Sequence, residues 1–114
     1  MELINCTPHN ISLYDDKGNH VMLIAPTKNA LARIETEEEY VEELWLDHQL
    51  IFITRDHIVG VTGLPEEKDG VKYIVSGKVL SYCTDRDDLI SPNTNNPVRD
   101  RDGKIIGVKG FLCR

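Results

Sequence analysis

The chain has 114 residues, of which 40% are hydrophobic and 28% are charged, and its formal net charge is −6. This length is close to the usual size of one domain and too short for two ordinary ones. The apolar fraction is typical of a globular protein rather than of a disordered chain. We therefore expect one domain spanning residues 1–114, with a core that needs no disulfide or metal to hold it together.

The acidic balance argues against two classes of partner. Non-specific binding to a nucleic acid requires a basic stripe, and no cluster of Lys and Arg in the chain is longer than two. A membrane surface is disfavoured for the same reason. A small phosphate-bearing ligand is compatible with the composition, because a pocket on an acidic protein can be locally basic.

The three cysteines, Cys6, Cys83 and Cys113, are odd in number and far apart, which indicates reduced thiols. The N-terminal segment has no signal-peptide pattern, and no apolar run approaches the ~20 residues that span a bilayer. We expect a protein of the cytoplasm.

No His or Cys pair has metal-ligand spacing, and no Gly-rich dinucleotide or P-loop segment is present, so we expect no metal and no cofactor.

Short apolar runs alternate with turn residues in the first third of the chain. Residues 11–14 and 20–25 are such runs, and the Asp, Gly and Asn of residues 15–19 between them suit a tight reversal. This pattern predicts a hairpin. Residues 30–35 alternate apolar and polar side chains after a break, which predicts a third strand.

The next segment, residues 36–45, is ambiguous. Thr36 with Glu39 resembles a capping box that opens a helix, whereas the aromatic and β-branched residues that follow suit a strand. Because residues 50–54 are strongly β-like, a second hairpin is favoured over a short helix.

Residues 59–65 predict a strand that ends in a turn, and residues 71–76 predict a buried strand. The segment from Ser76 to Cys83 either continues that strand or forms a short helix capped by Ser76, and the helix is favoured.

Polar residues dominate from position 84 to position 102. A run of this length without regular structure is usually functional or disordered in a small domain. Residues 104–112 then predict a closing strand after a turn.

The elements together predict a mostly-β (α+β) fold: a small antiparallel sheet or partly open barrel of about six to eight short strands with one short helix.

Five sequence motifs are spread over nearly the whole chain. They are Ile4–His9, Gly63–Pro65, Tyr73–Ser76, Arg86–Asp88 with Ser91-Pro92, and Asn96–Arg99 with Gly103. Together they resemble a family of small proteins of phages, prophages and mobile elements, which opens with Ile-Asn-Leu-Thr-Pro-His; Cys6 here replaces the leucine. The resemblance implies a hairpin over residues 37–54. By analogy with other small phage proteins, it also implies a sponge that sequesters a nucleotide signal of host immunity.

Thr7-Pro8-His9 lies where the first strand must turn, and a structural turn explains the Thr and the Pro. His9 is then free to contact a phosphate or ribose oxygen or to act as a general base. The alternative is a histidine whose ring nitrogens bond to nearby backbone.

The polar segment supplies Arg86, Asp87, Asp88 and Arg99 as further ligand-binding candidates. An Arg fork suits bidentate contact with phosphate, and carboxylates accept hydrogen bonds from ribose hydroxyls. The alternative for each is a cap or a salt bridge that ties the loop down. Only convergence of these residues with His9 would favour the ligand site.

The leading hypothesis is a non-catalytic protein that binds a nucleotide-derived ligand through Thr7, His9, Arg86, Asp87, Asp88 and Arg99. A homo-oligomer is expected because exposed edge strands could pair between copies and close the pocket. One alternative is a small hydrolase or lyase, either with His9 as base and Asp87 or Asp88 as its orienting carboxylate or with Cys6 or Cys83 as nucleophile. Another is an inhibitor that contacts a host protein through the acidic residues 35–43.

Overall fold

The structure is a computed structural model that describes all residues from 1 to 114. It is mostly β with one short helix, which confirms the expected fold class, and none of its sheets closes into a barrel. The strands number ten, more than the six to eight expected. In chain order the elements are β1 (Glu2–Asn5), β2 (Ile11–Tyr14), β3 (His20–Ile24), β4 (Arg33–Leu46), β5 (Gln49–Thr62), β6 (Val71–Ile74), α1 (Gly77–Tyr82), β7 (Leu89–Pro92), β8 (Pro97–Arg99), β9 (Ile105–Val108) and β10 (Phe111–Leu112).

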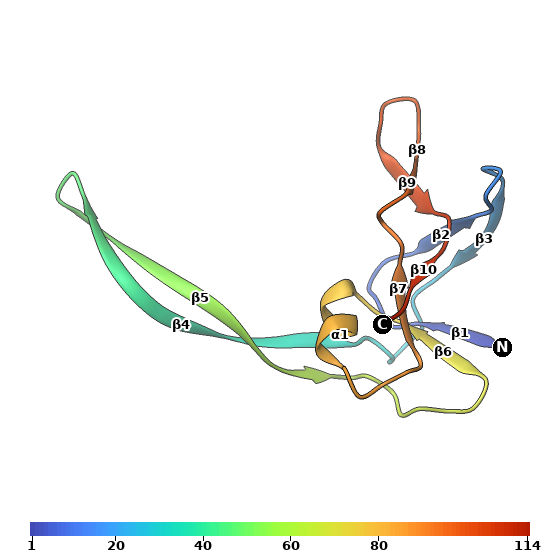
Figure 1. Ribbon diagram of the computed structural model, residues 1–114, viewed down its shortest axis with the longest axis horizontal. Coiled ribbons are helices and arrows are strands. Elements are labelled where there is room, and N and C mark those ends of the chain that lie inside the picture. The colour runs from blue at the N-terminus through green and yellow to red at the C-terminus, as the bar shows by residue number, and fades with distance from the viewer.

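The first sheet has the strand order β1-β6-β7-β10 (Figure 1). Strand β6 pairs in parallel with both β1 and β7, whereas β10 pairs with β7 in the antiparallel sense. Helix α1 connects β6 to β7, so these three elements form a crossover unit. The expectation of an antiparallel sheet is therefore wrong for the centre of this sheet.

The second sheet has the order β3-β2-β9-β8. Strands β2 and β3 form the hairpin predicted around residues 15–19, which is confirmed. The predicted closing strand is wrong, because residues 104–112 divide into β9 in this sheet and β10 in the first. The segment 84–102 also contains β7 and β8, so the prediction of a run without regular structure is wrong there.

Strands β4 and β5 form a separate two-stranded sheet of 14 residues each. The favoured second hairpin is confirmed, and β4 extends the predicted third strand through the ambiguous segment. The hairpin turns at Asp47 and His48, whose φ angles of 47° and 65° are both positive. Positive φ at both central residues is typical of the two-residue turns that match strand twist.

Gly63 ends this hairpin where it joins the rest of the molecule. Its φ is +81°, and a Cβ at this position would collide with the carbonyl oxygen of Leu31. Only glycine fits both the backbone angle and the close approach.

Helix α1 begins after Ser76, whose Oγ accepts a hydrogen bond from the Val79 amide at 3.3 Å. The predicted capped helix is confirmed, and the alternative of a continued strand is wrong.

No helix of this structure combines the length and the hydrophobicity that a membrane crossing requires.

Replacing the Ser76 cap tests how much this hydrogen bond stabilises the fold. We expect Ser76→Ala to lower the free energy of unfolding by about 1 kcal/mol, because the Val79 amide loses its partner. Urea denaturation followed by circular dichroism measures the change, and Ser76→Asp, which keeps a capping oxygen, should restore most of it. Equal losses in both variants would contradict the role of the cap.

The core consists of two clusters that share strand β6. Tyr73 and Val75 point toward α1 and join the larger cluster, whereas Ile74 points to the other side and packs between the two sheets. The larger cluster contains Cys6, Ala30, Tyr73, Val75, Val79, Leu80 and Leu89. The alternation along β6 follows from the two-residue period of a strand, and burial of both faces is typical of a strand inside a parallel arrangement.

Candidate functional site

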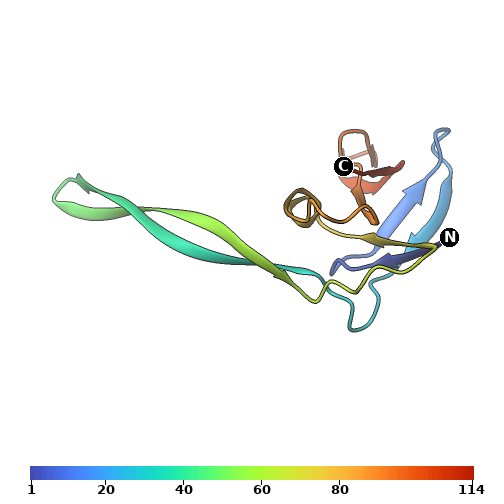
Figure 2. The ribbon, with the colours of Figure 1, turned by 60° about the horizontal axis from the view of Figure 1, so that its bottom comes forward.

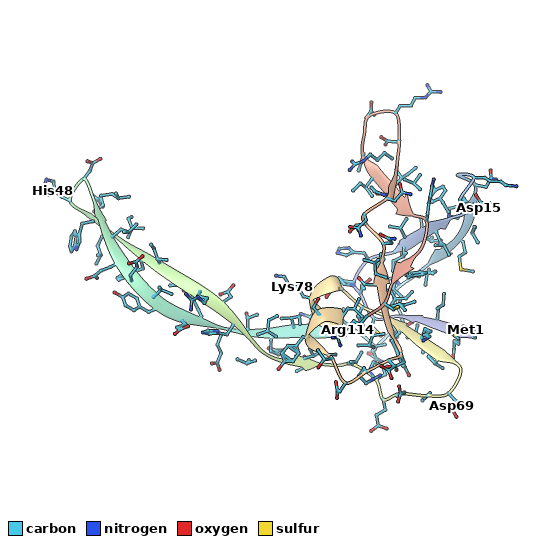
Figure 3. The ribbon with its side chains drawn as sticks, in the orientation of Figure 1. Met1, Asp15, His48, Asp69, Lys78 and Arg114 are labelled. Atoms are coloured by element: carbon cyan, nitrogen blue, oxygen red, sulfur yellow. The ribbon has the colours of Figure 1, made fainter.

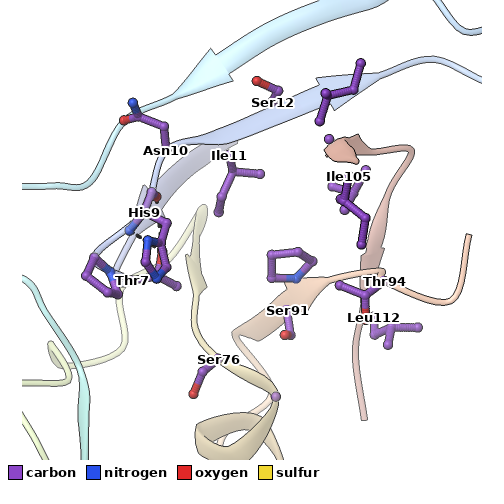
Figure 4. A pocket seen from close by; sticks show the side chains of 16 residues that line it. Thr7, His9, Asn10, Ile11, Ser12, Ser76, Ser91, Thr94, Ile105 and Leu112 are labelled. Carbon is purple, nitrogen blue, oxygen red and sulfur yellow. Dashed lines mark hydrogen bonds between the residues drawn. The ribbon is translucent and has the colours of Figure 1, made fainter. Parts of the chain in front are cut away.

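An open cleft of about 850 Å³ lies between the segment after β1, strand β9 and the start of α1. Its apolar wall consists of five residues: Ile11, Ile105, Ile106, Val108 and Leu112. Hydroxyl-bearing side chains also line it, from Thr7, Ser12, Ser76, Ser91 and Thr94. Figure 4 shows His9 on one side of this space and Thr94 with Leu112 on the other. This volume and mixture of apolar and polar lining are typical of small-molecule sites.

Asn5 holds the Thr7–His9 turn in place. Its Nδ2 donates to the carbonyl oxygens of His9 at 2.8 Å and of Ile24 at 3.0 Å. Its Oδ1 accepts from the Thr7 amide at 2.9 Å and from the Thr7 hydroxyl at 2.7 Å. The side chain is 1% exposed, so these bonds form away from solvent. Asn5 is the residue that the sequence interpretation missed, although an Asn side chain commonly bonds to the backbone two residues further on in a turn.

Close approach between β2 and β9 shapes the adjoining wall. A Cβ on Gly107 would lie 2.6 Å from the carbonyl oxygen of Ser12 and would also meet the ring of Tyr14. The glycine therefore permits β9 to approach β2, and the side chains of Ile106 and Val108 reach the cleft beside it.

The ring of His9 projects from this turn and is exposed. Its backbone is fixed by Asn5 and Thr7, but its ring nitrogens make no hydrogen bond within the chain. The alternative of a histidine tied to nearby backbone is therefore wrong. Among the residues that line the cleft, His9 is the only titratable one.

Arg86 and Asp88 form a structural ion pair outside the cleft. Arg86 Nε and Nη2 donate to the two oxygens of Asp88 at 2.8 and 2.7 Å, and Nη2 also donates to the Pro65 carbonyl at 3.0 Å. The guanidinium lies 5.8 Å from the ring centre of Tyr73. Asp88 is 6% exposed. The hydrogen bond from Arg86 lowers the pKa of Asp88 below its ordinary value. This pair ties the loop after α1 to the segment at Pro65 that follows β5.

Asp87 and Arg99 complete the predicted set, and neither lines the cleft. Asp87 is exposed, and its backbone carbonyl accepts a bond from Lys72. Arg99 Nη1 donates to the Gly103 carbonyl at 2.7 Å within the β8–β9 hairpin. Arg99 lies opposite Ile105 in the register, so its side chain is on a strand next to the cleft wall. The six predicted residues therefore do not converge: Thr7 and His9 line the cleft, Arg99 lies beside it, and the other three lie elsewhere.

The cysteines do not supply an activated nucleophile. Cys6 is buried, and burial raises its pKa to about 11. Burial also raises the pKa of Cys83. Both side chains stay protonated at neutral pH, where the thiol is a poor nucleophile. No three His, Cys, Asp or Glu side chains come together in a group that could hold a metal ion.

The cleft thus offers one histidine, several hydroxyl groups and aliphatic walls, with no carboxylate beside the histidine. Such a lining can bind a small molecule through apolar contact and a few directed hydrogen bonds. A general base normally has a group that orients it, and neither Asp87 nor Asp88 takes that position. Comparison with known protein families, curated proteins and solved structures finds no match for this chain.

Proposed function

We propose that this chain binds a small nucleotide-derived ligand in the cleft and releases it chemically unchanged. The observation that carries the proposal is the free imidazole of His9, fixed by its backbone in the wall of a cleft of ligand size. The ring can donate to a phosphate or ribose oxygen, while the aliphatic wall around Ile105 covers a base. Arg99, beside the cleft, is the nearest of the predicted arginines to that wall and can extend the site toward a phosphate.

The resemblance of the N-terminal motif to phage and prophage proteins gives this proposal its setting. In that setting the ligand is an immune signal of a bacterial host, and the protein is a sponge in the host cytoplasm. Sequestration requires tight binding without turnover, which agrees with a cleft that pairs no acid with its single histidine.

The test is to incubate the purified protein with cyclic mononucleotides, cyclic dinucleotides and cyclic ADP-ribose, then denature it and recover the ligand. Chromatography and mass spectrometry follow each compound. A compound that is depleted from solution and returned intact supports sequestration. A compound that is returned altered makes the hydrolase or lyase alternative the better account, and no depletion overturns the proposal for these ligand classes.

Substitution of His9 tests the position of the site. We expect His9→Ala to weaken binding of the retained compound at least about tenfold, because one hydrogen bond to a charged oxygen is lost. His20→Ala is the matched control, since His20 is exposed on β3 and does not line the cleft. Isothermal titration calorimetry measures both. Equal affinity of His9→Ala and the unmodified protein would place the ligand elsewhere.

A further inference from the structure

The β4–β5 hairpin, residues 33–62, projects from the molecule as a long arm (Figures 1 and 2). We call this segment the arm, and residues 1–32 and 63–114 the head. Only the base of the arm packs on the head, where Ile34 and Val61 lie against the larger core cluster. Beyond the base, the two strands pair only with each other. Two strands alone are marginally stable in water, so the arm needs a further surface to pack against.

The arm exposes large apolar side chains, most of them in its outer part. Trp45 is 66% exposed, Phe52 59% and Tyr40 57%. The full set is Tyr40, Val41, Leu44, Trp45, Leu46, Leu50, Ile51, Phe52, Ile58 and Val59. Together they expose on the order of 1,000 Å², which exceeds the about 800 Å² that each partner buries in an interface of standard size. An exposed apolar area of this size is characteristic of an interaction surface.

Both faces of the arm tip are apolar. Trp45 pairs with Leu50, and Phe52 lies two residues further along the same face, where its ring meets Tyr40 edge-on. Leu44 pairs with Ile51 on the opposite face. Figure 3 shows side chains projecting to both sides of the arm up to the turn at His48. A flat surface such as a bilayer would cover one face only and would leave the other in water.

The charge is divided unequally between the arm and the head. The arm contains eight acidic and two basic residues, whereas the head contains eleven of each, so the whole formal charge of −6 resides on the arm. Two arms placed side by side would repel each other, whereas an arm placed on a neutral head would not. The head also exposes apolar side chains on its edge strand β3, where Val21, Met22 and Leu23 are 53%, 45% and 57% exposed.

We propose that the arm tip packs against the head of a second copy of this chain. A second copy is present whenever the chain is made, which suits a hairpin that is unstable without a partner. In a two-fold symmetric pair the contact occurs twice, because each arm reaches the other head. The burial of both tips then gives an interface of the size found in obligate dimers. None of the arm-tip or β3 residues named here lines the cleft, so the proposal does not rest on ligand binding there.

The unmodified protein provides the first test, because Trp45 is its only tryptophan and lies at the arm tip. Light scattering gives the mass over a dilution series, and tryptophan emission reports whether the tip is buried. We expect a dimer or larger closed assembly with blue-shifted emission that resists acrylamide quenching, and a red shift as the mass falls on dilution. A monomer at all concentrations, or an oligomer in which Trp45 stays fully quenchable, overturns the proposal.

The second test substitutes the tip. We expect Phe52→Arg to raise the dissociation constant of the assembly at least a hundredfold, because a charge replaces a buried ring. Asp16→Asn is the control: it changes the net charge by the same amount at an exposed turn of the head. Far-UV circular dichroism checks that both variants fold. Equal masses for both variants at every concentration would show that copies associate through another surface.

A photoreactive side chain at the tip identifies what it touches. In a mixture of unlabelled and ¹⁵N-labelled copies of the variant Leu46→benzoylphenylalanine, cross-links between a light and a heavy chain are intermolecular. Cross-links from the tip to head peptides, β3 among them, support the proposal. Cross-links that join arm to arm only would overturn the placement on the head.

Discussion

Replacing Asn5 with alanine is expected to lower the free energy of unfolding by about 3 kcal/mol. The reason is the number of groups that this one buried side chain satisfies. Without it, the Ile24 carbonyl and the Thr7 amide lose their bonds to the Asn5 side chain, and the His9 carbonyl keeps only the Thr7 hydroxyl at 3.2 Å. Each unsatisfied group in a buried setting costs about 1–3 kcal/mol. Urea denaturation at neutral pH measures the loss.

Asn10→Ala is the matched control for that experiment. Asn10 is exposed, and its side chain makes no hydrogen bond within the chain, so we expect a change within about 0.5 kcal/mol. At a temperature where the Asn5→Ala variant is still folded, it should bind the ligand of the cleft more weakly than the unmodified protein does. The reason is that Thr7 and His9 lose their fixed positions. Equal stability of the two alanine variants would show that water replaces the Asn5 amide.

Replacing Arg86 with alanine is expected to cost about 3 kcal/mol of stability, because it leaves the carboxylate of Asp88 buried without its partner. Arg86 also donates a hydrogen bond to the Pro65 carbonyl, and this bond connects two loops. Arg86→Lys should recover only part of the loss, since an ammonium does not reproduce the bidentate contact. Arg101→Ala, at an exposed turn, is the control and should change stability by less than about 0.5 kcal/mol.

The same pair predicts how stability depends on pH. Arg86 lowers the pKa of Asp88 in the folded protein. The ion pair therefore contributes its full stabilisation above the pKa of Asp in the unfolded chain, about 3.9. This stabilisation is lost as the pH falls through the lower pKa that Asp88 has in the folded protein. The stability difference between the unmodified protein and Asp88→Asn should therefore be constant near neutrality and shrink below about pH 4. Thermal unfolding at a series of pH values measures it. A difference that grows as the pH falls would contradict this assignment.

Elements with strong local signals were predictable from the sequence. The β2–β3 hairpin follows from Asp15 and Gly18 in its turn, and α1 follows from Ser76 before an apolar helical face. The strand over residues 71–74 follows from its β-branched and aromatic residues, Val71, Tyr73 and Ile74. In each case the residues that decide the structure are neighbours in the sequence.

Pairings between distant segments were not predictable in this way. Nothing within residues 2–5 indicates that they lie parallel to residues 71–74. The division of the last segment between two sheets depends on a turn at Lys109 and Gly110 that brings β10 beside β7. Strand β7 was missed because its short apolar core, Leu89-Ile90, is surrounded by Asp, Pro and Asn. Long-range packing, rather than local preference, fixes these elements.

The candidate site was predictable only in part, because only some of its residues have a local signature in the sequence. A Thr-Pro-His turn has a local signature, and the structure places Thr7 and His9 in the cleft. Arginine and aspartate two residues apart suit either a ligand or each other, and only the fold shows that Arg86 and Asp88 bond to each other. The aliphatic wall comes from β9 and β10, whose positions depend on the distant pairings.

The central position of β6 has a consequence for the order of folding. β6 lies between β1, which begins at residue 2, and β7, whose outer neighbour β10 ends at residue 112. The first sheet is therefore incomplete until residue 112 has left the ribosome. Contacts of such long sequence separation make folding slow, because the loops between them must close first. The arm, residues 33–62, is synthesised before β7 and β10, so a nascent chain exposes the apolar side chains of the tip before the head can assemble.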